Sequence, residues 1–145
     1  MKYSDLKAIK NFCKDLFSTP DWREVVAEIE AGGSDFEVDG VRFINSSDID
    51  RIQQEELGND EYILGCFNAW FIAEVIGVDQ DVIEVMQKAE AFEAIGKLII
   101  SLGKLEELQA AYVSADGYGH YFNSYDFGEE ELSVNGETFH VFDNR

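Results

Sequence analysis

The sequence has few positive charges for its length. Its 145 residues include 11 Lys and Arg against 30 Asp and Glu, which gives a formal net charge of −19 at pH 7. Proteins bind nucleic acids largely by neutralising backbone phosphates with Lys and Arg, so direct binding to nucleic acid is not expected. Solubility alone needs far less charge, and we therefore expect the acidity to serve a basic partner.

Cysteine is also scarce. Only Cys13 and Cys66 are present, each in an apolar helical context, "KNFCKDLF" and "ILGCFNAWF". Two cysteines so far apart do not indicate a disulfide framework, and we expect both to be buried free thiols.

Long hydrophobic runs are missing. The longest apolar stretches are too short and too interrupted to span a bilayer. The opening "MKYSDLKAIK" has no apolar core of the kind that signal peptides carry. These patterns predict a cytoplasmic protein without membrane contact.

The residue types that bind metals or catalyse reactions are few and scattered. The two histidines and two cysteines form no pair at zinc-ligand spacing. The segment "DQDVIEVMQKAE" (79–90) has acids at the first, third and last positions of a calcium loop, but it lacks the glycine at the sixth. No nucleophile elbow, phosphate-binding glycine loop or metalloprotease helix is present. We predict no catalytic residue, no metal and no cofactor.

The histidines leave one catalytic alternative open. His120 lies beside Tyr118, Tyr121 and Asp126, and such a cluster could move protons. His140 alternates with apolar residues in a predicted strand and is expected to face solvent.

Hydrophobic periodicity predicts a mainly helical protein. The expected helical segments are 4–17, 18–33, 46–58, 59–77, 79–103 and 104–113. The segment 59–77 is the most apolar and covers more than one helix face, so we expect one central buried helix there. The segment 79–103 fits either one long helix or two short ones.

Two β-hairpins are predicted, at about 36–44 and 130–142. Asp39-Gly40 and Asn135-Gly136 each stand between alternating apolar residues, which is the strongest sequence signal for a two-residue type I′ turn. The two hairpins can join in one small antiparallel sheet, since an isolated hairpin is barely stable in water. The sequence therefore predicts an α+β fold, mainly helical, with residues 1–145 as a single domain.

The acids are unevenly spread along the chain. Between Ile52 and Asn144 there are nineteen acids and only three bases, whereas four lysines stud the first helix. Helix-borne carboxylates three or four residues apart have separations similar to those of phosphates along a DNA strand. The acids predicted to bind a partner are Asp79, Asp81, Glu84, Glu106, Glu107, Asp116, Asp126, Glu129, Glu130 and Glu131.

An aromatic stretch, "YVSADGYGHYFNSYDFGEEEL" (112–132), follows the last predicted helix. Its rings can cover the end of the core, with glycines permitting tight turns. Alternatively, Tyr118, Tyr121 and Tyr125 form an aromatic docking spot rimmed by acids and suited to a partner rich in Arg. Both interpretations are open at this point.

Three features together resemble small acidic proteins of phages and mobile elements: the charge, the short helical body, and the end "GYGHYFNSYDFGEEEL" with its terminal hairpin. The pattern is similar to the ArdA-type antirestriction proteins, and anti-CRISPR proteins follow the same physical logic. The ArdA-type proteins are acidic DNA mimics that occupy the DNA-binding groove of type I restriction–modification enzymes. The resemblance implies a non-enzymatic inhibitor of a basic nucleic-acid-binding enzyme, and it assigns no particular residue.

Three other hypotheses remain beside this one. An immunity protein or antitoxin that neutralises a basic toxin would show the same electrostatics. An acidic structural or accessory protein would use its charge for solubility only, and an enzyme would centre on His120. A homodimer would extend the charged surface, although no residue pattern demands one.

Overall fold

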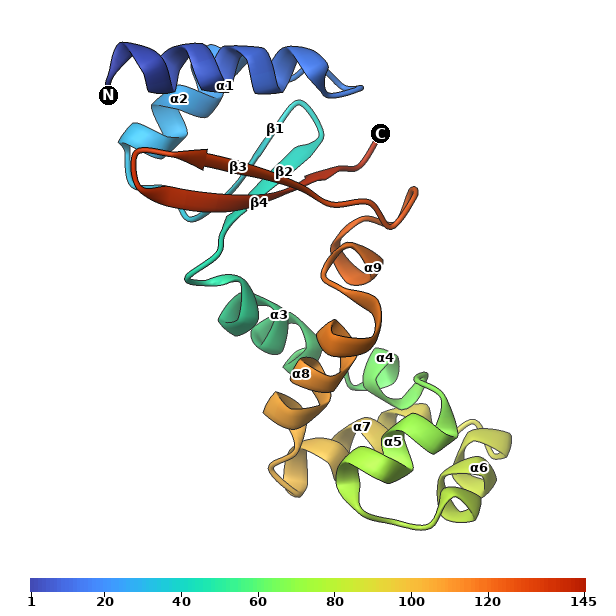
Figure 1. Ribbon diagram of the computed structural model, residues 1–145. Helices are drawn as coiled ribbons and strands as arrows, with labels where there is room; N and C mark the ends of the chain where they lie inside the picture. The colour runs from blue at the N-terminus through green and yellow to red at the C-terminus, as the bar shows by residue number, and fades with distance from the viewer. The chain divides into compact units, whose positions relative to one another are not determined.

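A computed structural model describes all 145 residues, and its fold is α+β with helices dominant, as predicted (Figure 1). Nine helices accompany one four-stranded antiparallel sheet. The elements in chain order are α1 (Tyr3–Asp15), α2 (Trp22–Glu30), β1 (Asp35–Val38), β2 (Val41–Asn45), α3 (Ile49–Gly58), α4 (Glu61–Gly65), α5 (Ala69–Ile76), α6 (Gln80–Lys88), α7 (Phe92–Ser101), α8 (Leu105–Asp116), α9 (Gly119–Phe122), β3 (Glu130–Val134) and β4 (Glu137–Asp143).

The backbone divides into two compact units. Unit 1 comprises residues 1–49 and 116–145, and unit 2 comprises residues 50–115. Unit 1 contains the sheet, and unit 2 is made of helices. The single-domain organisation stays a prediction. No helix has the length and apolar character needed to cross a membrane.

Both predicted hairpins form, and they join in the sheet of unit 1. The strand order is β1-β2-β4-β3, and Phe43 of β2 lies opposite Val141 of β4 in the central pair. Asp39-Gly40 and Asn135-Gly136 all have positive φ, between 50° and 83°. Type I′ turns require this conformation at both central residues, and Asn, Asp and Gly adopt it most readily. The turn chemistry therefore fixes the register of each hairpin.

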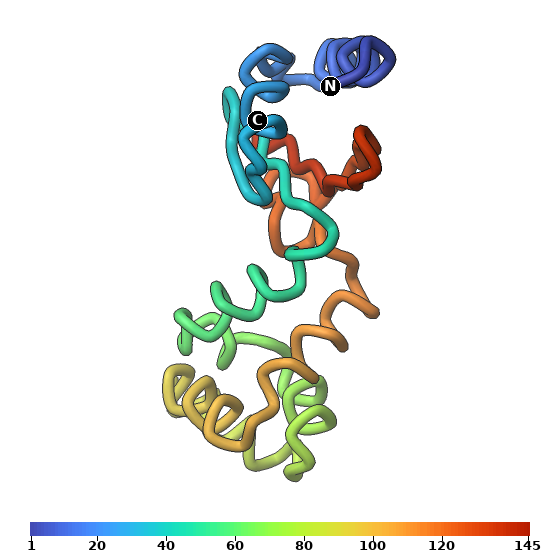
Figure 2. The backbone as a smooth tube through the Cα atoms, turned by 90° about the vertical axis from the view of Figure 1, so that its left-hand side faces the viewer, coloured from blue at the N-terminus to red at the C-terminus, as the bar shows by residue number.

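The core of unit 1 lies between one face of the sheet and the helices α1 and α2. Both views place these two helices together at one side of the strands (Figure 1 and Figure 2). Alternate strand residues supply most of this core, as a period of two requires. Its buried strand residues are Phe36, Val38, Val41, Phe43, Leu132, Val134, Phe139 and Val141, and its buried helical residues are Ile9, Cys13, Val25 and Ile29.

The opposite face of the sheet is covered in part by α9, a short helix within the aromatic stretch. The Phe122 ring lies 5.1 Å from the Phe142 ring of β4, and the Arg42 guanidinium lies over Phe122 at 5.0 Å. Tyr118, just before α9, places its ring 4.9 Å from the His140 ring. His140 was expected to face solvent, and this expectation is wrong, because only 12% of its side chain is exposed.

In unit 2 the expected central helix is broken into α4 and α5, which corrects the prediction for 59–77. The chain leaves helical geometry after Gly65, and the side-chain amide of Gln87 donates hydrogen bonds to the carbonyls of Gly65 (3.0 Å) and Phe67 (2.8 Å). These bonds satisfy backbone groups that the break frees. The segment 79–103 likewise forms two helices, separated at Glu90, whose φ is positive.

Two glycines allow α4 and α7 to pack with their backbones in contact. A Cβ added at Gly65 would lie 2.0 Å from the carbonyl oxygen of Phe92, and one added at Gly96 would lie 2.0 Å from that of Glu61. Both distances are far inside van der Waals contact, so only glycine fits at either position. Around this crossing unit 2 buries aliphatic side chains, including Leu64, Ile72, Ile83, Ile95 and Ile99.

The two cysteines differ in their surroundings. Cys13 is buried in unit 1 as expected, whereas Cys66 of unit 2 is exposed, because it stands at the break between α4 and α5. Burial, with a smaller effect of the nearby Asp21 charge, raises the pKa of Cys13 from 9.0 to about 11.

Candidate functional site

The acid excess is shared almost equally by the two units. Unit 1 has 17 acids and 7 bases, a net charge of −10, and unit 2 has 13 acids and 4 bases, a net charge of −9. The contrast between a mixed N-terminal end and an acidic remainder disappears on folding, since unit 1 combines the lysines of α1 with the acids of residues 116–145. Each unit by itself can therefore attract a basic partner.

The predicted partner-binding residues fall in both units. Unit 2 contains Asp79, Asp81, Glu84, Glu106 and Glu107. Unit 1 contains Asp116, Tyr118, Tyr121, Tyr125, Asp126, Glu129, Glu130 and Glu131.

In unit 2 three of these acids lie along α6. Asp79 caps the helix by accepting a hydrogen bond from the backbone N–H of Asp81 at 2.9 Å, and Glu84 accepts one from the Gln80 amide at 2.9 Å. An acid at the first turn is favoured by the helix dipole. The carboxylates of Asp79 and Glu84 are thus held in place by contacts within the helix.

Glu106 and Glu107 occupy the first turn of α8. Glu107 forms an ion pair with Lys104 at 3.2 Å, so the charge of Glu107 is partly neutralised and attracts a partner less strongly.

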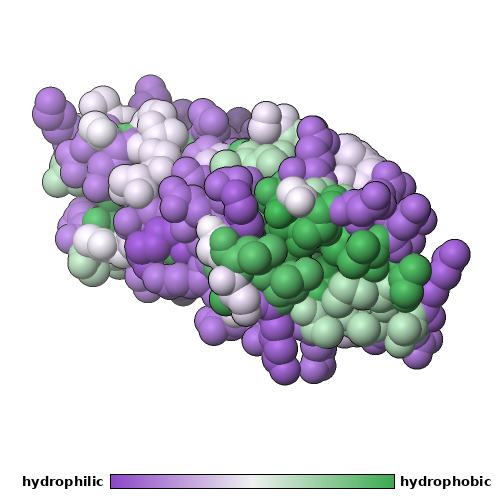
Figure 3. Space-filling model, turned by 90° about the horizontal axis from the view of Figure 1, so that it is seen from below, coloured by the Kyte–Doolittle hydropathy of each residue, from purple (hydrophilic) through white to green (hydrophobic).

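Apolar side chains are exposed beside the acids of α6. Val82 and Val85, one helical turn apart on α6, are 50% and 66% exposed, and Trp70 at the start of α5 is 54% exposed. Figure 3 shows hydrophobic side chains gathered on the face of unit 2 that includes α5 and α6, with hydrophilic residues around them. We call Trp70, Val82 and Val85 the apolar patch. Sequence periodicity missed it, because it assigned Trp70 to a buried helix.

In unit 1 the aromatic stretch has both buried and exposed rings. Phe122 is buried against the sheet face opposite α1 and α2, whereas Tyr118 and Tyr121 are half-buried. Tyr125 and Phe127 are exposed, at 62% and 56%. The stretch therefore buries two rings, Phe122 in unit 1 and Tyr112 at its start in unit 2, and presents Tyr125 and Phe127 at the surface.

The loop between α9 and β3 is held by a buried asparagine. The side-chain amide of Asn123 donates to the carbonyl of Gly128 at 3.0 Å, and its oxygen accepts from the backbone N–H of Tyr125 at 3.0 Å. His120 stacks on Phe127, with ring centroids 4.7 Å apart.

The surface around Tyr125 already holds a guanidinium of the same chain. Arg145 lies over the rings of Phe17 (4.8 Å) and Tyr125 (5.2 Å) and forms ion pairs with Asp126 (3.3 Å) and Asp143 (3.8 Å). The predicted docking spot for an arginine is thus occupied by the chain's own Arg145. A partner's arginine would have to displace that side chain.

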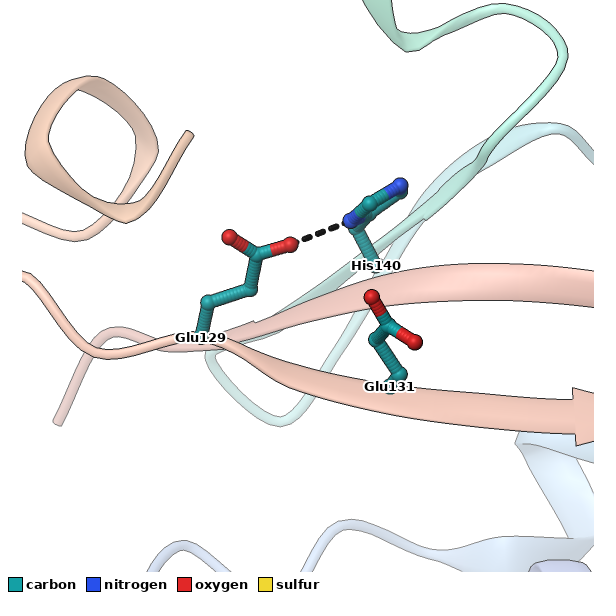
Figure 4. A group of neighbouring side chains, drawn as sticks. All are labelled: Glu129, Glu131 and His140. Carbon is teal, nitrogen blue, oxygen red and sulfur yellow. Dashed lines mark hydrogen bonds and ion pairs between the residues drawn. The ribbon is translucent and has the colours of Figure 1, made fainter. Parts of the chain in front are cut away.

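A third group of side chains converges on the sheet face that carries His140. Glu129, Glu131 and His140 point toward one another, and an ion pair joins Glu129 to Nδ1 of His140 (Figure 4). One possible ligand atom from each residue lies within 4.8 Å of the others. Sequence spacing gave no sign of this group, because strand pairing brings residue 140 beside residue 131.

Comparison with known proteins adds no relative: no family model, curated protein or solved structure matches this chain.

Proposed function

We propose that this protein is a non-enzymatic inhibitor that binds the basic groove of a nucleic-acid-binding enzyme by presenting carboxylates in place of phosphates. A restriction or CRISPR enzyme is the class of target, and the encounter takes place in the cytoplasm. The observation that carries the proposal is the large net negative charge on each compact unit, −10 and −9.

The use of the bases within the molecule supports this proposal. Arg42, Arg51, Lys97, Lys104 and Arg145 each form an ion pair with an acid of the same chain. Since acids outnumber bases so strongly, most carboxylates have no basic partner to neutralise them. A basic groove would gain favourable Coulomb interactions across this surface and would be steered toward it from a distance.

The α6 surface supports a protein target in particular. It combines Asp79, Asp81 and Glu84 with the exposed Val82 and Val85 on one short helix. Interfaces that bind tightly need desolvated apolar contacts in addition to charge, because exposed ion pairs alone contribute little. We propose α6 as the part of unit 2 that enters the partner's groove.

The experiment measures DNA cleavage by a panel of purified restriction and CRISPR nucleases as the protein is added. We expect inhibition of at least one nuclease, relieved by excess DNA, with an affinity that falls steeply as salt rises from 50 to about 500 mM because the attraction is screened. Absence of inhibition across the panel, or a complex insensitive to salt, would contradict the proposal.

Two triple variants test the role of α6 at equal charge. Asp79→Asn/Asp81→Asn/Glu84→Gln removes three charges from α6 and keeps a capping side chain at residue 79. Glu24→Gln/Glu28→Gln/Glu30→Gln removes three exposed charges from α2 as the matched control. We expect the α6 variant to weaken inhibition about tenfold more than the control. Equal losses would mean that total charge matters and that α6 has no special role.

An immunity protein or antitoxin against a basic toxin is the second candidate. The apolar patch favours this candidate, because a folded toxin presents more apolar surface than the DNA-binding groove of an enzyme does. If the partner is a toxin, the substitution Trp70→Ser should weaken binding more than the α6 triple variant does. The complex with the toxin should also persist at high salt. A toxicity-rescue assay with the partner toxin measures this difference.

A further inference from the structure

We propose that Glu129, Glu131 and His140 form a binding site for a divalent transition-metal ion of the Zn²⁺ type. One oxygen from each carboxylate and one imidazole nitrogen lie within 4.8 Å of one another. Ligand atoms around a zinc ion stand about 2.0–2.2 Å from the metal, so an ion at their centre needs only small side-chain movements.

Strand pairing places the three donors on one face. Glu131 of β3 lies directly opposite His140 of β4 in the antiparallel register. Glu129 precedes Glu131 by two residues, so its side chain points to the same face, as Figure 4 shows. Glu130 lies opposite Val141, a residue of the core on the other face, and therefore points away from the group.

The imidazole is enclosed and oriented before any ligand binds. The His140 side chain is 12% exposed, and the Tyr118 ring covers it at 4.9 Å. Its Nδ1 faces Glu129. A rigid donor loses little conformational entropy on binding, which favours a specific ion over loose association with surface acids.

The charge of the group is unbalanced without a cation. Two carboxylates converge on one imidazole, and neither Glu129 nor Glu131 forms an ion pair with Lys or Arg. Like charges held close together repel one another, and a divalent ion between the two carboxylates would replace that repulsion with attraction.

The donor chemistry selects the metal. One imidazole nitrogen with two carboxylate oxygens suits Zn²⁺ and its neighbours, with water in the remaining position, whereas Mg²⁺ and Ca²⁺ prefer oxygen ligands throughout. When bound, the ion would join the loop that ends at Glu129 to the strand β4. The site would thus stabilise the end of the aromatic stretch, and it is independent of the proposed inhibition.

The test titrates the metal-free protein with Zn²⁺ alone, by calorimetry, and follows the His140 ring by ¹H–¹⁵N NMR. We expect one tight Zn²⁺ per chain, a shift of the His140 ring nitrogens, and no comparable effect of Mg²⁺. The variants His140→Gln and Glu131→Gln should each weaken binding tenfold or more.

Two matched variants exclude a general effect of charge or of histidine. Glu130→Gln removes the neighbouring carboxylate that points away, and His120→Gln removes the other histidine, so both should bind Zn²⁺ like the wild type. Circular dichroism confirms that each variant folds. Binding that is unchanged in His140→Gln, or equally weakened in Glu130→Gln and Glu131→Gln, would overturn the proposal.

Discussion

The two units build their interiors in different ways. Unit 1 packs large side chains between a sheet and two helices, and stacked rings such as Phe36 and Phe43, 5.1 Å apart, fill its centre. Unit 2 brings the backbones of α4 and α7 together at Gly65 and Gly96, and it fills the remaining space mainly with aliphatic side chains and the ring of Tyr112. The stability of unit 1 therefore depends on the volume of its core side chains. The stability of unit 2 depends on the two glycines, which have no side chain, where α4 crosses α7.

The surfaces of the two units differ in how their exposed apolar side chains are contacted. In unit 1 the exposed rings of Phe17 and Tyr125 contact Arg145 of the same chain, so this part of the surface is already engaged within the molecule. In unit 2 the apolar patch lies exposed next to the acids of α6. For the proposed inhibitor, this difference favours unit 2 as the source of apolar contacts with the target, whereas the charge of both units would attract it.

The largest expected difference between the units is in thiol reactivity. Exposed Cys66 should react with iodoacetamide at pH 8 at least a hundredfold faster than Cys13, because the thiolate is the reactive form and Cys13 is buried with a pKa of about 11. Mass spectrometry of digested samples measures both rates, and a Cys66→Ser variant is the control. Comparable rates in the native protein would contradict the described burial of Cys13.

The raised pKa of Cys13 makes the stability of unit 1 depend on pH. Because the folded state holds the Cys13 proton more tightly than the unfolded chain, this stabilisation is fully present below pH 9 and is lost as the pH rises from 9 to about 11. A Cys13→Ala variant should lack this alkaline loss in chemical denaturation.

The largest expected effect on stability is at the helix crossing of unit 2. Gly96→Ala should lower the free energy of unfolding by about 3 kcal/mol or more, because a Cβ 2.0 Å from a backbone oxygen forces the helices apart. Gly103→Ala is the matched control. Its φ of 69° is unfavourable for alanine, but open space surrounds it, so we expect a loss of about 1 kcal/mol. Equal losses would mean that the crossing is looser than described.

The tryptophans test the single-domain prediction in the same variant. Trp22 belongs to unit 1 and Trp70 to unit 2. Two Gly96→Ala proteins are compared, one that retains only Trp22 and one that retains only Trp70. Their fluorescence signals should show the same lowered unfolding midpoint if the chain unfolds as one domain. Separate midpoints would show two domains.

The smallest expected effect is on the apolar patch. Val85→Thr should change the free energy of unfolding by less than about 0.5 kcal/mol, because Val85 is exposed. Val25→Thr, which places a hydroxyl in the core of unit 1, should cost about 2 kcal/mol. Urea denaturation measures both. A large loss in Val85→Thr would show that this residue is needed for the fold and is not left available for a partner.

The hairpins and the fold class could be predicted because their signals are local. Asp-Gly and Asn-Gly select a turn by backbone conformation alone, and the alternation of apolar residues around them needs no knowledge of the rest of the chain. The break in 59–77 could not be found in this way. It depends on Gln87, which is distant in sequence and bonds the freed carbonyls, and on a close approach at Gly65.

The site residues show the same limit. The acids of α6 and the ring of Tyr125 could be proposed from sequence, since charge and helical spacing are local. The filling of the Tyr125 spot by Arg145, and the meeting of Glu129, Glu131 and His140, arise from pairing between distant segments. Sequence spacing alone cannot supply such contacts when no motif accompanies them.

The strand order leaves β1 and β3 at the two edges of the sheet, where unpaired backbone groups could recruit a strand from another molecule. β1 exposes Asp35 and Glu37, and β3 begins with Glu130 and Glu131. Two copies that approached edge to edge would bring like charges together, so this route to aggregation, or to a dimer with a continuous sheet, is discouraged. The acids at these edges thus help to keep neighbouring molecules apart.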